Sequence, residues 1–164
     1  MEKALRSVVA VAVVVVLLYG GYRLRRHLAT VRAYKNQNER YAVKSIRDIK
    51  EAEQKYKAAH PDIGYTCRLE DLGPPPEKSQ PDEKHAALIK AELATGQIRD
   101  YLYTFLDCPP MPRTNYHLLA VPFSSEAGSH AFCSTQADWI KSSSIGDAQV
   151  CFDHGNLVSP PAQK

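Results

Sequence analysis

The sequence predicts an α+β fold in which one long N-terminal helix packs on a small antiparallel sheet. An apolar run from Val8 to Tyr22 continues, with no Pro or turn signal, into an amphipathic stretch that ends at His60-Pro61. Short segments rich in aromatic and β-branched residues follow after residue 100. A helix with one apolar stripe and a sheet with one apolar face can bury these surfaces against each other.

The apolar run predicts a membrane anchor over residues 1–24. It is just long enough to cross a bilayer of about 30 Å if Arg6 and Arg23 reach the two interfaces. The predicted anchor includes Val8, Val16, Leu18 and Tyr22. A cleaved secretory signal and a buried core helix are the alternatives, but Tyr19-Gly20-Gly21 places a bulky residue where a signal peptidase requires a small one. We therefore expect the anchor to be uncleaved.

The amphipathic continuation is expected over residues 25–60. Its apolar positions recur at three- and four-residue steps, which predicts one packing face. They are Ala42, Val43, Ile46, Ile49, Ala52, Tyr56 and Ala59. The helix should stop before Pro61, because Pro disfavours helical geometry at the residue before it.

Residues 61–155 are expected to form one globular domain, followed by a flexible tail at 156–164. We expect a loop over 69–81 and a short helix over 83–95 that ends at Gly96. Strands are predicted at 101–106, 116–121 and 130–135, with a fourth short strand at 138–141, arranged as an antiparallel meander.

Charge is distributed unevenly along the chain. Residues 1–35 hold seven of the 21 basic residues and one of the 18 acidic residues, so the remainder carries a net charge of −3. A nucleic-acid-binding domain is expected to have a basic face, and here the basic residues cluster beside the anchor instead. Nucleic acid is therefore not an expected partner.

Four cysteines, Cys67, Cys108, Cys133 and Cys151, all follow the anchor, and none forms a Cys-x-x-Cys pair. An even set in a small anchored domain favours two disulfides and an oxidising side of the membrane. The positive-inside rule disagrees, because arginines at 23, 25, 26 and 32 follow the span and this would keep the domain in the cytoplasm. We give the cysteines more weight.

A zinc site is the alternative for two of these cysteines. His130-x-x-Cys133 and Cys151-x-x-His154 are two chelating pairs that could hold a tetrahedral ion in a reducing compartment. A disulfide between Cys133 and Cys151 is the simpler interpretation. We therefore expect no metal and no other cofactor.

An N-terminal anchor helix and several short segments follow one another in a definite order. The segments are Ser45-Ile-Arg-Asp-Ile-Lys-Glu-Ala-Glu-Gln-Lys-Tyr56, Gly64-Tyr-Thr-Cys-Arg-Leu-Glu-Asp-Leu-Gly73, Leu88 to Gly96, Tyr101-Leu-Tyr-Thr-Phe105, Tyr116-His-Leu-Leu-Ala-Val-Pro122 and Ala131-Phe-Cys-Ser-Thr-Gln-Ala-Asp-Trp-Ile140. This order resembles that of the type IV pilins and the pseudopilins of type II secretion. The resemblance covers about residues 40–141. It implies a helix packed on an antiparallel sheet and a C-terminal region fixed by a disulfide, which suits Cys133 and Cys151.

The chain departs from that family at its N-terminus. Polymerising pilins carry a leader that ends in Gly, followed by an aromatic or apolar residue and a Glu, and no such stretch exists here. In a filament core Arg23, Arg25 and Arg26 would be buried with few acids to pair them, at several kcal/mol per ion. We therefore expect a pilin-like domain that stays on its anchor.

Enzymatic activity is not expected. The sequence has no Gly-rich phosphate loop, no Gly-x-Ser-x-Gly and no His-Glu-x-x-His, and the remaining histidines stand singly at 27, 60, 85 and 117. Acidic residues fall on the polar face of the helix and in loops, where solvation is their ordinary role.

These observations predict a single-pass protein of the bacterial inner membrane, with its domain in the periplasm or outside the cell. The expected role is structural or adaptor work beside a type IV pilus or a type II secretion system. The expected partners are the lipid bilayer and other pilin-like subunits or the machinery itself. The alternatives are a stand-alone domain that senses a ligand or partner, and a zinc-bearing domain tethered in the cytoplasm.

Overall fold

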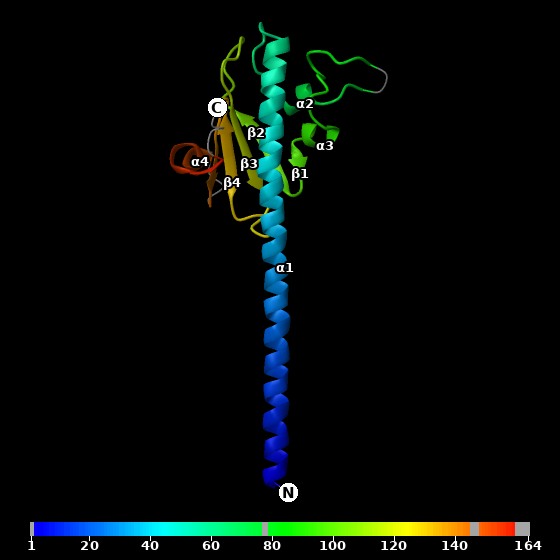
Figure 1. Cartoon of the computed structure of the whole chain (residues 1–164), viewed down its shortest axis with the longest axis vertical. Helices are drawn as coiled ribbons and strands as arrows, with labels where there is room; N and C mark the ends of the chain where they lie inside the picture. The colour runs from blue at the N-terminus through cyan, green and yellow to red at the C-terminus, as the bar shows by residue number, and fades with distance from the viewer. Residues whose placement is uncertain (1, 77–78, 145–147, 160–164) are drawn as a thin grey trace. The chain divides into compact units, whose positions relative to one another are not determined.

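The computed structural model describes residues 2–76, 79–144 and 148–159, and it describes side chains from Val13 onward except at 148 and 159. Helix α1, Glu2–Ala59, is continuous and ends one residue before His60-Pro61, which confirms the predicted long helix and its stop. The chain divides into two units, Met1–Tyr34 and Lys35–Lys164, and α1 contributes to both. The second unit contains the sheet and the remaining helices (Figure 1).

Within the second unit, the predicted apolar stripe of α1 lies in the core. Five of the seven predicted positions are buried: Ala42, Ile46, Ile49, Ala52 and Tyr56. Val43 is only partly buried, and Ala59 is exposed because the helix ends there and the chain turns away. The three- and four-residue spacing therefore identified the packing face, but it extended that face one turn too far.

Within the described residues, six antiparallel strands form one sheet in the order in which they occur in the chain. The strands are β1 Gln97–Ile98, β2 Tyr101–Leu106, β3 His117–Pro122, β4 Ala131–Thr135, β5 Ile140–Ser143 and β6 Asn156–Ser159. The meander and β2 are confirmed, β3 and β4 begin one residue later than predicted, and β5 lies two residues beyond its predicted place. Strands β1 and β6 were not predicted.

The sheet is covered on both faces. The face toward α1 carries Tyr101, Tyr103, Leu118, Ala120, Phe132 and Ile140 and forms the main core with the helix. On the other face, Leu119 and Cys133 pack with Cys151 of α4, Ala148–His154. Figure 1 shows α4 on the side of the sheet away from α1. A sheet with only one apolar face was expected, and this second small core is the difference.

The segment before the sheet differs from prediction. Residues 83–95 do not form one helix, and only α3, Ala91–Ala94, is helical, whereas α2, Leu69–Leu72, lies in the predicted loop. The backbone amides of Ala86, Ala87, Leu88 and Ile89 donate to carbonyls of residues 71–73 at 2.8–3.0 Å. These long-range bonds replace the local bonds of a helix, and Ala87 has a φ of 55°, outside the helical region.

The predicted flexible tail is also partly wrong. Residues Asn156–Ser159 pair with β5 as strand β6, and 160–164 lie outside the described residues. The Cys133–Cys151 disulfide joins β4 to α4, immediately before this strand. The disulfide therefore holds the chain next to the sheet edge at which β6 adds.

Polar side chains of α1 attach the loops of the sheet to the helix. The buried amide of Asn38 donates to the carbonyl of Ala127 at 3.0 Å, and Glu39 Oε1 accepts from the Ser129 amide at 2.7 Å. About three turns further on, Lys50 Nζ donates to Ser134 Oγ at 3.0 Å and to the Thr135 carbonyl at 2.9 Å. These bonds fix both ends of β4 against α1.

Candidate functional site

The first candidate site is the apolar surface of α1 in the N-terminal unit. Val16 and Leu18 are 68% and 69% exposed, and Tyr22 is 60% exposed. Val8 lies before the first described side chain. Across the described part of the chain, no helix has a stretch long and apolar enough to cross a membrane. The exposed apolar residues nevertheless lie on consecutive turns and form one continuous surface. Such a surface indicates an interaction site, whereas single exposed apolar residues are ordinary.

The second candidate site is a buried carboxylate near the end of α1. Glu53 has no exposed surface, although its neighbours Glu51 and Gln54 face solvent. Its Oε2 accepts a hydrogen bond of 2.9 Å from the backbone amide of Thr66. Its Oε1 and the Nε of Arg113 are buried with no hydrogen-bond partner among the described residues. A carboxylate in this position is poorly solvated.

This burial changes the acidity of the group. Desolvation raises the pKa of Glu53 to about 7 from its usual value of 4.5. The backbone amides of Thr66 and Cys67 oppose this shift, Asp71 adds to it, and the guanidinium of Arg113 lowers the pKa. Because desolvation is the largest contribution, Glu53 changes charge near neutral pH.

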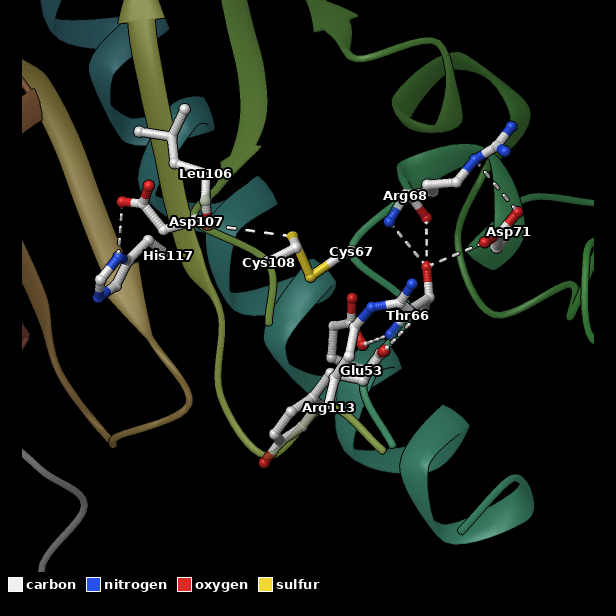
Figure 2. Close-up of a disulfide and its surroundings, with 11 residues drawn as sticks. Glu53, Thr66, Cys67, Arg68, Asp71, Leu106, Asp107, Cys108, Arg113 and His117 are labelled. Atoms are coloured by element: carbon white, nitrogen blue, oxygen red, sulfur yellow. Dashed lines mark hydrogen bonds and ion pairs between the residues drawn. A yellow bond between two sulfur atoms is a disulfide. The ribbon is translucent and has the colours of Figure 1, made fainter. Parts of the chain in front are cut away.

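A disulfide lies directly beside this carboxylate. Cys67 is joined to Cys108, which links the chain after α1 to the chain after β2 (Figure 2). Thr66 Oγ1 donates to the Arg68 carbonyl at 2.7 Å and accepts from the Arg68 amide at 2.8 Å. Cys67 has a φ of 62°, in the left-handed region. The buried carboxylate, the threonine and the disulfide together hold this tight turn.

On its other side, the turn that contains Thr66 and Cys67 contacts the loop before β3. The Tyr65 amide donates to the Arg113 carbonyl at 3.1 Å, and the Arg113 amide donates to the Ile63 carbonyl at 2.8 Å. Between them, Gly64 has a φ of 79°, and a Cβ at this position would lie 2.1 Å from the Arg113 carbonyl oxygen. Glycine is therefore required for the two segments to approach this closely.

The structure joins the residues of the predicted zinc alternative in a different way. Cys133 and Cys151 form a disulfide, so neither sulfur is a free thiolate for a metal. His130 Nδ1 lies 3.1 Å from Glu39 Oε1, and His154 is exposed. Among the described residues, no group of three or more His, Cys, Asp or Glu side chains is placed to hold a metal ion.

A groove of about 670 Å³ runs between α1 and the segment 87–99. Its walls include apolar side chains from both elements, such as Ala52 and Leu93. At its rim, the guanidinium of Arg99 lies 4.0 Å from the centre of the Tyr41 ring, and Lys44 and Lys55 are paired with acidic residues one turn away on α1. The groove is open and mixed in charge, which suits a polypeptide surface better than a small molecule.

Comparison with family models, with curated proteins and with solved structures finds no match for this chain. The pilin resemblance therefore stays a prediction. The class that the fold itself defines is an α+β protein with a long N-terminal helix, a six-stranded antiparallel sheet and two disulfides.

Glu53 was missed by the sequence analysis, which assigned acidic residues to solvated positions. The signal was present, because residue 53 is four positions after Ile49 and three before Tyr56, on the apolar face of α1. A charged residue at a core position of an amphipathic helix indicates a buried, bonded group. Its partner at Thr66 follows the helix stop and could not be identified from periodicity.

Proposed function

We propose that this protein is a membrane-anchored, non-catalytic pilin-like protein with a structural or adaptor role beside a type IV pilus or a type II secretion system. The observation that carries the proposal is the exposed apolar surface of α1 around Val16 and Leu18, on the same helix whose C-terminal half forms the core of the domain. Burial of that surface in a bilayer would remove it from water.

The two disulfides support an oxidising location for the domain. Cys133 and Cys151 are fully buried, and Cys67 is partly buried. Disulfides of this kind persist in secreted and periplasmic proteins and are rare in the cytosol. We therefore place the domain in the periplasm or outside the cell, with α1 entering the bacterial inner membrane once.

The arrangement of α1 on a consecutive antiparallel meander supports the pilin-like assignment, as does the disulfide that fixes the C-terminal strand. Arg23, Arg25 and Arg26 argue against a filament subunit, because burying them among neighbouring helices would be costly without acidic partners. An adaptor that remains in the membrane avoids this cost.

Membrane fractionation of the native host tests the proposal. The full chain should remain in the membrane pellet after alkaline carbonate extraction, and its domain should be cleaved by protease added to spheroplasts. A variant that lacks residues 2–24 but keeps an export signal is the matched control, and it should be released as a soluble domain. Extraction of the full chain by carbonate, or protection of the domain in intact spheroplasts, would contradict the proposal.

The groove beside Tyr41 and Arg99 favours a second candidate, a stand-alone domain that senses a protein partner. The two candidates differ in assembly. An adaptor should migrate within a large complex in native gels of mildly solubilised membranes, whereas a stand-alone sensor should migrate near its own mass of 18.3 kDa plus detergent.

A further inference from the structure

We propose that four arginines, which directly follow the apolar surface of α1, bind the headgroups of anionic phospholipids. This arginine collar consists of Arg23, Arg25, Arg26 and Arg32. The inference rests on the proposed membrane anchorage and deepens it, because it assigns a lipid class to one segment of the helix.

The collar has no acidic neighbours along the helix. Residues 3–38 contain no Asp or Glu, so none of the four arginines has a carboxylate one turn before or after it. All four side chains are exposed. In the folded domain, by contrast, Lys44 and Lys55 are paired with Asp48 and Glu51 on the next turn. The collar is therefore a positive surface that its own helix does not neutralise.

The four arginines of the collar lie within one half of the helix circumference. At about 100° per residue, Arg25, Arg26 and Arg32 lie roughly 200°, 300° and 180° around the axis from Arg23. The preceding exposed residues, Val13 to Leu18, are consecutive and therefore point in all directions. A helix that lies flat in a membrane surface has its charges on one side and its apolar residues on the other. Apolar residues on every side of the helix instead suit a helix that enters the membrane end-on.

The turn between the two segments has the composition of a membrane interface. Tyr19 and Tyr22 are exposed there, and the guanidinium of Arg23 lies 5.9 Å from the centre of the Tyr19 ring. Tyrosine rings favour the level of the lipid headgroups. The collar, which begins one residue after Tyr22, is thus placed where guanidinium groups can form paired hydrogen bonds with phosphate oxygens.

Native mass spectrometry of the full chain, released from vesicles that contain both phosphatidylcholine and phosphatidylglycerol, tests the collar. Retained phosphatidylglycerol should exceed its share of the vesicle, and high salt during reconstitution should reduce the enrichment. Each arginine is expected to contribute about fivefold to binding at an anionic surface. A variant with R23Q, R25Q, R26Q and R32Q should therefore retain the two lipids in the proportion in which they were supplied.

Two matched variants complete the experiment. Replacing four exposed lysines of the folded domain, with K55Q, K57Q, K84Q and K90Q, removes the same charge and should leave the enrichment unchanged. Replacing the four arginines with lysine should preserve most of the enrichment, because positive charge supplies most of the attraction. An equal loss in the domain variant would overturn the assignment to the collar.

The outcomes separate this inference from the proposed function. If the unmodified chain enters vesicles but retains both lipids without preference, the collar proposal is wrong and anchorage stands. If the chain enters vesicles of neither composition, anchorage itself is wrong and the collar proposal fails with it.

Discussion

The backbone amide of Thr66 donates a 2.9 Å hydrogen bond to the carboxylate of Glu53, and this bond joins α1 to the first cysteine-bearing turn of the domain. Glu53 is on the apolar face of the helix, and Thr66 precedes Cys67 of the first disulfide. The carboxylate therefore satisfies a buried amide at the cost of its own solvation. Its titration is consequently linked to the stability of the domain.

We predict that Glu53 makes the domain less stable as the pH rises. Its pKa in the folded state, about 7, is above the usual value of 4.5, so folding favours the protonated carboxyl. The contribution of Glu53 to the free energy of unfolding should be greatest below pH 4.5, fall as the pH rises to about 7 and stay constant above that. The expected loss is on the order of 3 kcal/mol.

Chemical denaturation of the full chain in detergent at several pH values, with Glu53→Gln beside the unmodified chain, measures this contribution. The amide oxygen of Gln can still accept the Thr66 bond, so the variant should lose the pH dependence and be the more stable protein at pH 8. Glu51→Gln, on the exposed side of the same helix, is the control and should keep the pH dependence of the unmodified chain. Parallel pH profiles for Glu53→Gln and the unmodified chain would refute the prediction.

Gly64→Ala should destabilise the domain by more than about 2 kcal/mol, because a Cβ would lie 2.1 Å from the Arg113 carbonyl oxygen and φ is 79°. Gly21→Ala is the matched control, since a Cβ at Gly21 meets no atom within 4 Å. Alanine in a helix is favoured over glycine by up to about 1 kcal/mol, so this control should be neutral or stabilising. Thermal unfolding in detergent distinguishes the two, and similar midpoints would contradict the account of this turn.

Removal of the disulfides should destabilise the domain to different extents. Cys67 and Cys108 are 41 positions apart in the sequence, and Cys133 and Cys151 are 18 positions apart. The entropy of loop closure alone predicts losses of about 4 and 3 kcal/mol for the paired Cys→Ala variants. Loss of Cys133–Cys151 should also release β6, visible as faster amide hydrogen exchange at 156–159. Unchanged exchange there would mean that β6 is held by its strand pairing alone.

Lys50→Met should loosen the turn between β4 and β5. Lys50 Nζ donates to Ser134 Oγ and the Thr135 carbonyl and also contacts the carbonyls of Ala137 and Trp139. Leaving these acceptors without the ammonium should cost about 1–3 kcal/mol and increase hydrogen exchange at 136–140. The exposed Lys55→Met serves as the comparison, and equal effects of the two variants would count against a specific role for Lys50.

Periodicity predicted the elements whose burial is set by local pattern. The apolar spacing around Ile46 and Ile49 located the core face of α1, and the alternation of Tyr101 and Tyr103 located β2. Pro61 located the end of the helix. In each case the sequence neighbours determine the structure, so the pattern can be read without knowledge of the fold.

The elements that were missed depend on contacts between distant segments. The stretch 83–95 has the composition of a helix, but its amides pair with carbonyls of 71–73. Strand β6 has little apolar pattern and follows the bridge at Cys151. The environment of Glu53 likewise depends on Thr66 and Arg113, which are far away in sequence. Long-range hydrogen bonds and a disulfide override local propensity in the first two cases, and in the third distant residues determine the surroundings of a side chain.

The central claim, an exported domain on an uncleaved membrane anchor, is tested most directly by the intact mass of the protein from native host membranes, denatured without reductant. Each disulfide removes two hydrogens, so the full-length chain should be lighter by about 4 Da than its reduced form. A full-length mass with all four thiols free would contradict the exported location. A mass that lacks the N-terminal segment would contradict the uncleaved anchor.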